Sequence, residues 1–323
     1  MQANDFKGLY GIIPTPARAG SAKLNAKNTV DLDESERLIK NLIRDGVSGL
    51  IVLGTTGECA TLSTADYRAF VDLVCKTTNK KIPVFVGATA LGGHEVFDRL
   101  SFVKEQGGTG TLLGLPMWQP CTNDMAVRFY SEVAELFPKL PIMVYANTRA
   151  FRFPFSTDFW TRVSQSAPTV VSAKSSHANG LVENISSTGG RIHFMPSDMV
   201  VSKFVDLSPR TTTSCWATAA GMGPEPSKKI IDAILADDKG VIAHMSEKIA
   251  WCNAPLEPIL KNAEVFASYN IQVEKIRMQE SGYCNPGPSR PPYDVIPADF
   301  AEAAKECGRR WKQLRAEIGA LNT

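Results

Sequence analysis

The sequence predicts an α/β fold of the (β/α)8 TIM-barrel type, followed by a C-terminal helical extension. Short apolar segments that are typical of strands alternate with amphipathic, helix-like segments over residues 9–215. This alternation indicates parallel strands joined by crossover helices, and eight such units can close into a barrel. The structural alternative is a doubly wound open sheet. That fold needs a glycine fingerprint after its first strand, and the segment IIPTPARAG does not supply one.

The first two units show the signals on which this assignment depends. Residues 9–15, LYGIIPT, are short and apolar, as expected for a strand. Residues 33–46 begin with an acidic turn, carry apolar residues on one face and end at a glycine, which predicts an amphipathic helix. Residues 49–54, GLIVLG, form a continuous apolar run, and such runs are typical of strands covered on both faces. A helix capped by Ser63 follows at 63–78.

The same two signals recur along the rest of the predicted barrel. Thr122 or Asn123 is expected to cap one of the helices. Strands are expected at 83–87, 111–115, 141–145, 169–174, 191–195 and 211–215. Helices are expected between them at 93–106, 122–137, 156–165 and 197–206, with a weaker one before residue 191.

These patterns place the barrel core at residues 1–222, and the last barrel helix with the C-terminal extension at 223–323. We expect the extension to pack on the barrel and not to form an independent domain. Its helical patterns cover residues 226–237, 240–252, 256–267, 270–281 and 298–318, with a proline-rich connector at 284–297.

The composition excludes several classes of protein. A net charge of +2 gives no basic stripe for nucleic acid and no membrane-surface helix, so neither is expected as a partner. The seven cysteines are odd in number and include no CxxC pair, and the four histidines lack HExxH spacing, so we expect no disulfide framework and no metal site. The N-terminal segment lacks the apolar core of a signal peptide, and no apolar run is long enough to span a membrane. A cytoplasmic location is therefore expected.

Active sites of (β/α)8 barrels lie at the carboxyl ends of the strands. The strand at 169–174 ends on Lys174, and apolar barrel walls would lower the pKa of its ammonium group. A free amine can attack a keto carbon and form a Schiff base, which then accepts electrons from the substrate. The alternative is a lysine that extends to solvent or pairs with a carboxylate. From position alone the two interpretations are equally good.

Other notable residues end neighbouring strands. Tyr145 could shuttle protons beside the amine, or it could pack its ring and bond its hydroxyl to the backbone. The segment GTTGE offers the hydroxyls of Thr55 and Thr56 together with backbone amides, which suits a carboxylate. Its alternative is a glycine-framed turn with locally capping threonines. Trp118 is expected to pack, unless its ring faces an aromatic ligand.

In this order, the strand endings resemble the dihydrodipicolinate synthase / N-acetylneuraminate lyase superfamily of Schiff-base class I aldolases, over nearly the whole chain. The resemblance implies a lyase that needs no external cofactor, because Lys174 itself forms the Schiff base with a 2-oxo acid. It also implies that Thr55, Thr56 and Gly57 bind the pyruvate carboxylate and that Tyr145 moves protons. By the same analogy we expect a homo-oligomer, and specifically a tetramer.

Several stretches are similar to the bacterial benzylidenepyruvate-type hydratase-aldolases of polycyclic aromatic hydrocarbon degradation. They include LPMW at 115–118, YAN at 145–147, GECATLS at 57–63, YNIQVEKIRM at 269–278 and RPPYDVIPADF at 290–300. The similarity implies that Trp118 stacks against an aryl ring, and that Asn147 and Asn270 lie near the reacting oxygen or water. A synthase would more usually carry a tyrosine in place of Trp118 and no counterpart of Ala146.

The residues after the lysine decide the expected substrate. Relatives often carry an acidic residue or a tyrosine there, whereas this chain has Ser175, Ser176 and His177. Ser175 is expected to contact the substrate, and a polar wall of this kind favours an ortho-carboxylate. We therefore expect cleavage of trans-2'-carboxybenzalpyruvate to 2-carboxybenzaldehyde and pyruvate.

Three alternatives stay open. One is cleavage of trans-o-hydroxybenzylidenepyruvate to salicylaldehyde and pyruvate. Another is a different pyruvate-dependent aldolase, such as dihydrodipicolinate synthase. The least favoured is a non-enzymatic ligand sensor on the same barrel.

Overall fold

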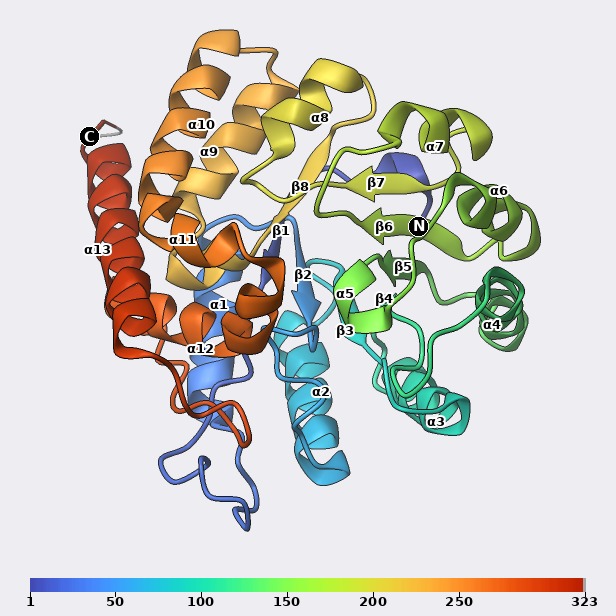
Figure 1. Cartoon of the computed structure of the whole chain (residues 1–323), viewed down its shortest axis with the longest axis horizontal. Helices are drawn as coiled ribbons and strands as arrows, with labels where there is room; N and C mark the ends of the chain where they lie inside the picture. Colours follow the sequence, from blue (N-terminus) through green and yellow to red (C-terminus); the bar gives the residue numbers. More distant parts are fainter. Residues whose placement is uncertain (322–323) are drawn as a thin grey trace.

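A computed structural model describes residues 1–321 as eight parallel strands surrounded by helices, which confirms the predicted (β/α)8 barrel (Figure 1). From β1 to β7, strands that follow one another in sequence pair in parallel, and β1 also pairs with β8. The strands are β1 (Gly8–Ile12), β2 (Gly49–Val52), β3 (Val84–Gly87), β4 (Gly110–Leu113), β5 (Ile142–Tyr145), β6 (Val170–Lys174), β7 (His193–Met195) and β8 (Ser214–Ala217).

The barrel closes between β7 and β8 through a bridge that lies just beyond the end of β7. Ser197 pairs there with Trp216 of β8. The N–H of Trp216 donates to the carbonyl of Pro196 at 2.9 Å, and the N–H of Asp198 donates to the carbonyl of Trp216 at 3.0 Å. The closing contact therefore fixes Trp216 at the carboxyl end of the barrel.

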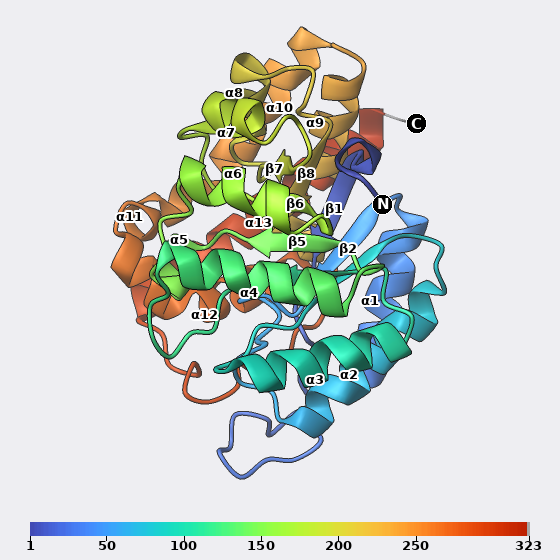
Figure 2. The ribbon, with the colours of Figure 1, turned by 90° about the vertical axis from the view of Figure 1, so that its right-hand side faces the viewer.

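Helices cover the outside of the barrel, and Figure 2 shows α3, α4 and α6 lying across one side of it. Ser63 and Thr122 cap α2 and α4, which confirms those two predicted helix starts. The barrel helices are α1 (Leu32–Arg44), α2 (Thr64–Thr78), α3 (Gly93–Glu105), α4 (Asn123–Leu136), α5 (Thr148–Phe151), α6 (Thr157–Ser166), α7 (Leu181–Ser187), α8 (Val201–Leu207) and α9 (Glu225–Leu235). No helix within residues 1–321 is both long and apolar enough to cross a membrane.

The C-terminal helices pack on the barrel and on one another. They are α10 (Lys239–Asn253), α11 (Glu257–Leu260), α12 (Ala263–Ser281) and α13 (Ala298–Leu321), and three 3-10 turns complete the described chain: η1 (Ala3–Asp5), η2 (Thr218–Met222) and η3 (Ala254–Leu256). Trp311 of α13 is fully buried, and its indole N–H donates to the carbonyl of Gly223 at 3.0 Å. The division of the chain after residue 222 stays a prediction.

Aromatic rings fill the amino-terminal end of the barrel. Phe6 stacks on His193 with ring centroids 5.3 Å apart, and it also contacts Tyr10 and Phe85. Burial lowers the pKa of His193 to about 4, so its ring is neutral at physiological pH. These rings therefore fill the amino-terminal end of the barrel interior.

Several expected elements have other bounds in the structure: the strand at 9–15 ends at Ile12, and the helix at 197–206 begins at Val201. Two further elements differ more. Residues 211–213 are not strand, because the hydroxyl of Thr212 and the N–H groups of Thr211 and Thr212 bond back to the carbonyl of Ser208 and make a turn. The strand runs from Ser214 instead, so it ends two residues later than predicted. The helix at 256–267 is also wrong, because α11 ends at Leu260 and α12 begins only at Ala263, with Asn262 as its cap.

Candidate active site

Lys174 is the last residue of β6, and it lies at the carboxyl end of the barrel. It pairs across the parallel ladder with Tyr145 of β5 on one side and with Met195 of β7 on the other. Side chains of paired residues project from the same face of a sheet. Lys174 and Tyr145 are thus held side by side by the strand register itself.

The amine of Lys174 lies in an aromatic environment away from water. The residue is 8% exposed, and its Nζ lies 3.5 Å from the centroid of the Trp216 ring and 5.0 Å from that of Tyr145. Burial lowers the pKa of Lys174 to about 7, while the charge of Glu274 raises it and that of Arg149 lowers it. About half of the amine is therefore free at neutral pH.

The hydroxyl of Tyr145 joins the strand endings to the GTTGE segment. It forms a hydrogen bond of 2.8 Å with the hydroxyl of Thr55, and the side-chain amide of Asn147 donates to it at 3.4 Å. Asn147 also caps α5, because its Oδ1 accepts from the N–H of Ala150 at 3.1 Å. The phenol is thus part of a short polar chain beside the amine.

The loop that contains Thr55 and Thr56 is tightly folded. A Cβ on Gly57 would lie 2.6 Å from the backbone nitrogen of Leu53, so the loop needs glycine at that position. The N–H of Glu58 donates to the carbonyl of Thr55 at 2.9 Å. Among the described residues, no group accepts a hydrogen bond from the N–H of Thr55 or Thr56. Two backbone donors are therefore free to bind an anionic group.

One face of α12 lies over the barrel mouth. Phe266, Asn270, Glu274 and Arg277 follow one another at helical spacing and share that face. The guanidinium of Arg149 lies over the Phe266 ring at 5.3 Å, and Arg277 donates to the hydroxyl of Thr218 at 2.6 Å, just after β8. The face consequently runs from the β5 side of the mouth to its β8 side.

Asn270 lies between these two contacts. Its Oδ1 is buried, and no hydrogen-bond partner for it occurs among the described residues. A buried acceptor without a partner is uncommon, because burial removes the water that would otherwise bind it. The amide of Asn270 is thus available to a ligand or a water molecule in the mouth.

The remaining residues singled out in the sequence lie on the loops that follow β4 and β6. The N–H of Ser175 donates to the carbonyl of Met195 at 2.8 Å. Ser176 and His177 are exposed, and they line a cavity of about 240 Å³ between the strand ends, α6 and α7. The indole of Trp118 is 76% exposed, so the expectation that it packs is wrong, and its ring faces are open to a ligand.

Trp216 is a site residue that the sequence analysis missed. Its indole N–H donates to the carbonyls of Ser175 and Met195 at 3.0 and 3.1 Å, which fixes the ring against the amine of Lys174. The rule of inspecting strand endings could have found it. The threonine run at 211–213 shifted the predicted strand and placed Trp216 outside it.

The site as a whole combines a partly free amine, a phenol that can exchange protons, and a loop with free N–H donors. Such a set suits covalent catalysis on a carbonyl compound that carries a carboxylate. Within residues 1–321, no group of three or more His, Cys, Asp or Glu side chains is arranged to hold a metal ion.

Two relatives and one solved structure match this chain over nearly their full length. The trans-O-hydroxybenzylidenepyruvate hydratase-aldolase of Pseudomonas putida is 34% identical over 321 residues, covering 98% of this chain and 96% of the relative. The trans-2'-carboxybenzalpyruvate hydratase-aldolase of Nocardioides sp. (strain KP7) is 33% identical over 323 residues, with 98% and 96% coverage. The solved structure described as PhdJ bound to substrate intermediate has a TM-score of 0.94 at 31% identity, covering 98% of this chain and 99% of that one. The profile of the Dihydrodipicolinate synthetase family matches residues 15–296.

Proposed function

The chain belongs to the dihydrodipicolinate synthetase family, and from this premise we propose that it is a Schiff-base hydratase-aldolase that cleaves an arylidene pyruvate. The observation that carries the proposal is the amine of Lys174, which is buried, has a pKa of about 7 and lies beside the phenol of Tyr145. The reaction needs no external cofactor, because the lysine is the electron-accepting group once it has formed an imine.

Imine formation is the first step. The free amine of Lys174 attacks C2 of the keto acid, while the hydroxyls and N–H groups of Thr55 and Thr56 hold its carboxylate. Loss of water gives a protonated imine that is conjugated with the C3–C4 double bond, so C4 becomes electrophilic. Water then adds its oxygen at C4 and a proton at C3, which gives a C4 hydroxyl.

Cleavage of the C3–C4 bond follows. Tyr145, directly or through water, takes the proton of the C4 hydroxyl, and the aromatic aldehyde leaves. The electron pair of the broken bond moves into the imine and forms an enamine. Protonation at C3 and hydrolysis then release pyruvate and restore the amine. Asn147 and the unpartnered amide of Asn270 are suited to hold the reacting water or hydroxyl.

One cation at the mouth suits an anionic aryl group, and the nearby Glu274 carboxylate is already paired with Arg277. Arg149 lies close enough to lower the pKa of Lys174 by its charge, so the same guanidinium can attract an ortho-carboxylate. The exposed ring of Trp118 provides a surface on which an aryl group can stack. We therefore favour trans-2'-carboxybenzalpyruvate, with 2-carboxybenzaldehyde and pyruvate as products. The trans-o-hydroxybenzylidenepyruvate substrate is the alternative, because a relative with that name is equally similar.

Other assignments are less well supported. Trp118 and Ala146 depart from the pattern of a dihydrodipicolinate synthase, although the chain shares that family's fold. A sensor without catalytic activity has no need of a lysine with a lowered pKa beside a phenol. A tetrameric assembly and a cytoplasmic location stay predictions.

Borohydride trapping tests the proposed function. With pyruvate present, reduction should attach one reduced pyruvyl group at Lys174, as measured by mass spectrometry of peptides. The purified protein should also condense pyruvate with 2-carboxybenzaldehyde faster than with salicylaldehyde, and much faster than with sugar aldehydes. Labelling of a different lysine would contradict the assignment of the amine, and a preference for sugar aldehydes would contradict the substrate class.

The pH dependence of trapping tests the lowered pKa. Below pH 7 the amine gains a proton and cannot attack a carbonyl, so the trapping rate should fall about tenfold per pH unit on the acid side. Above pH 7 the rate should level off, because the amine is already free. The measurement is the initial rate of trapping with pyruvate at pH values from about 5.5 to about 8.5, which lie on both sides of neutrality. A rate that keeps rising through this range would contradict a pKa of about 7.

A further inference from the structure

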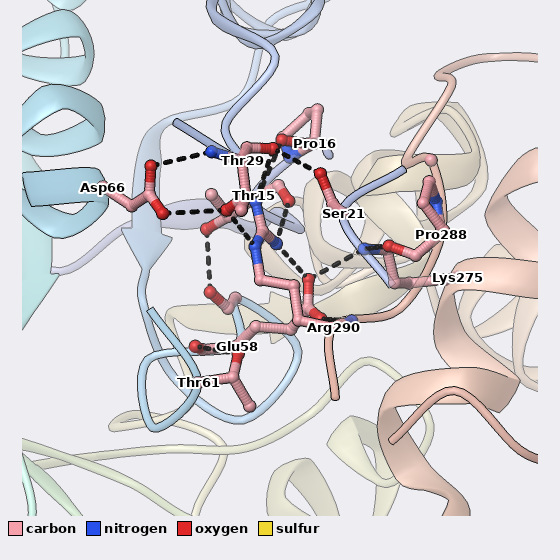
Figure 3. Close-up of polar contacts among 12 residues, drawn as sticks. Thr15, Pro16, Ser21, Thr29, Glu58, Thr61, Asp66, Lys275, Pro288 and Arg290 are labelled. Carbon is pink, nitrogen blue, oxygen red and sulfur yellow. Dashed lines mark hydrogen bonds and ion pairs between the residues drawn. The ribbon is translucent and has the colours of Figure 1, made fainter. Parts of the chain in front are cut away.

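Behind the Thr55–Thr56 loop lies a buried set of charges, which we call the Glu58 cluster: Glu58, Lys275 and Arg290 (Figure 3). The Glu58 carboxylate accepts hydrogen bonds from Nζ of Lys275 at 2.8 Å, from Nη1 of Arg290 at 2.6 Å and from the N–H of Arg290 at 2.8 Å. The side chains are 0%, 3% and 2% exposed, respectively. All three are therefore charged groups without access to bulk water.

Arg290 extends the cluster to the segment that follows β1. Its Nε donates to the hydroxyl of Thr29 at 2.8 Å, and its Nη1 donates to the carbonyl of Thr15 at 3.1 Å. Thr29 in turn donates to Asp66 of α2 through both its N–H and its hydroxyl, each at 2.9 Å. The carboxylates of Glu58 and Asp66 thus balance the positive charges of Lys275 and Arg290. Each of these four side chains has a hydrogen-bond partner.

The cluster acts on the backbone next to the proposed carboxylate site. Glu58 follows Gly57 directly and has a φ of +55°, which is uncommon for a residue with a side chain. Such a conformation persists only where surrounding contacts hold it. The hydroxyl of Thr15 adds one such contact, because it donates to the carbonyl of Gly57 at 2.7 Å. The two N–H donors of Thr55 and Thr56 therefore depend on contacts made by the next residues.

The proposed reaction uses none of these charges directly. Apolar side chains of similar volume would fill the same space without the desolvation that buried ions require. The ions form hydrogen bonds, which have a preferred direction, between segments that are distant in sequence. Lys275 comes from α12 and Arg290 from the proline-rich connector. A geometric role explains the cluster better than a role in packing.

We propose that Glu58 and Arg290 are positioning residues, which hold the Thr55–Thr56 loop in the conformation that binds the carboxylate of the 2-oxo acid. Arg290, which belongs to the connector, holds the Glu58 carboxylate by hydrogen bonds. Glu58 in turn holds the left-handed turn that orients the N–H groups of Thr55 and Thr56. The inference rests on the proposed function, because it assigns the loop to the substrate carboxylate. It extends that function by making recognition of the acid dependent on the C-terminal connector.

Discrimination between an acid and a neutral ketone is the property to measure. The wild-type protein should form trapped imine with pyruvate much faster than with acetone, which lacks the carboxylate. In Arg290→Met and Glu58→Gln this preference should fall about 10- to 100-fold, with a raised KM for pyruvate. The rate with acetone should stay unchanged, because the amine of Lys174 is not part of the cluster. Arg290→Lys keeps the positive charge but loses several of the N–H donors of the guanidinium. Its preference for pyruvate over acetone should therefore lie between those of Arg290→Met and wild type.

Arg315→Met is the matched control. Arg315 of α13 makes a bidentate ion pair with Glu225 of α9 at 2.7 Å, so it also ties the C-terminal helices to the barrel. Its hydrogen bonds go to Glu225, and among the described residues none goes to the Glu58 cluster. Its removal should leave the preference for pyruvate unchanged. If Arg290→Met does not fold, Thr29→Val removes the hydroxyl that links Arg290 to Asp66, and it should give a smaller loss of preference in the same direction.

The outcomes separate the two proposals. If wild-type protein forms no imine with pyruvate, the proposed function is wrong. If it does, and both the Glu58 variant and an Arg290 or Thr29 variant keep the wild-type preference, the positioning role is wrong. An equal loss with pyruvate and acetone would also overturn it, since that result would indicate general damage to the barrel.

Discussion

Replacement of Lys174 by methionine is expected to remove imine formation and, at the same time, to make the folded protein more stable. The catalytic loss should be on the order of 10⁴-fold or more in kcat/KM, because no other amine in the site can replace the nucleophile. Borohydride with pyruvate should leave the variant unlabelled. The side chains are similar in length, so methionine should fill the space beside Trp216 without a cavity.

The gain in stability follows from the lowered pKa. The unfolded chain binds a proton at Lys174 with the ordinary pKa of 10.5, whereas the folded protein does so only below about 7. Folding therefore carries a penalty below pH 7, on the order of 5 kcal/mol, which shrinks as the pH rises towards 10.5. Methionine removes this penalty, so the variant should melt several degrees higher than wild type at pH 7, and the difference should disappear near pH 10.

Lys104→Met provides the control for this experiment, because Lys104 is exposed on α3. It should change neither the melting temperature nor the activity appreciably. Thermal unfolding followed by circular dichroism at several pH values is the measurement. A Lys174→Met variant that is less stable than wild type at pH 7 would contradict the neutral, desolvated amine.

Replacement of Tyr145 by phenylalanine should lower kcat for cleavage by roughly 10²- to 10⁴-fold, the usual contribution of a positioned acid–base group. The phenyl ring would still pack against Phe151, whose ring centroid lies 5.4 Å away, so the fold should be kept. Trapped imine with pyruvate should still form, although more slowly, because the nucleophile remains. The variant is thus expected to separate imine formation from cleavage of the C3–C4 bond.

Tyr130→Phe is the matched control for this change. Tyr130 is completely buried, and its hydroxyl donates to the backbone carbonyl of Leu113 at 2.9 Å. Loss of that hydrogen bond should lower the free energy of unfolding by about 1 kcal/mol without altering kcat. For both variants, kcat is measured from the release of the aldehyde, and imine formation is measured by single-turnover trapping. Equal kcat in Tyr145→Phe and wild type would remove the phenol from the mechanism.

Local patterns in the sequence predict the part of the site that lies on strand endings. Lys174 and Tyr145 end apolar runs in neighbouring units, and in parallel strands such endings meet at one edge of the barrel. Trp216 was not predicted as a site residue, because the threonines at 211–213 suggest an earlier strand. The observed strand begins only at Ser214. The one-turn helix α5 was not predicted either, because a segment of four residues is too short to show helical periodicity.

Contacts between distant segments could not be predicted from one sequence. Glu58 and Arg290 are separated by 232 positions, and neither has a sequence neighbour that indicates a buried ion pair. Asn270 lies on a helix whose outer and inner faces are both polar, so its orientation towards the mouth depends on how α12 is anchored at Phe266 and Arg277. Only the folded chain supplies that information.

The place of Arg290 late in the sequence bears on how the enzyme is made. A ribosome synthesises β6 and the turn at Glu58 before it reaches the connector that carries Arg290, so the turn lacks its contacts with Arg290 until the chain is nearly finished. If Arg290 has the positioning role proposed above, the contacts that support the turn at Glu58 are complete only after the connector has docked.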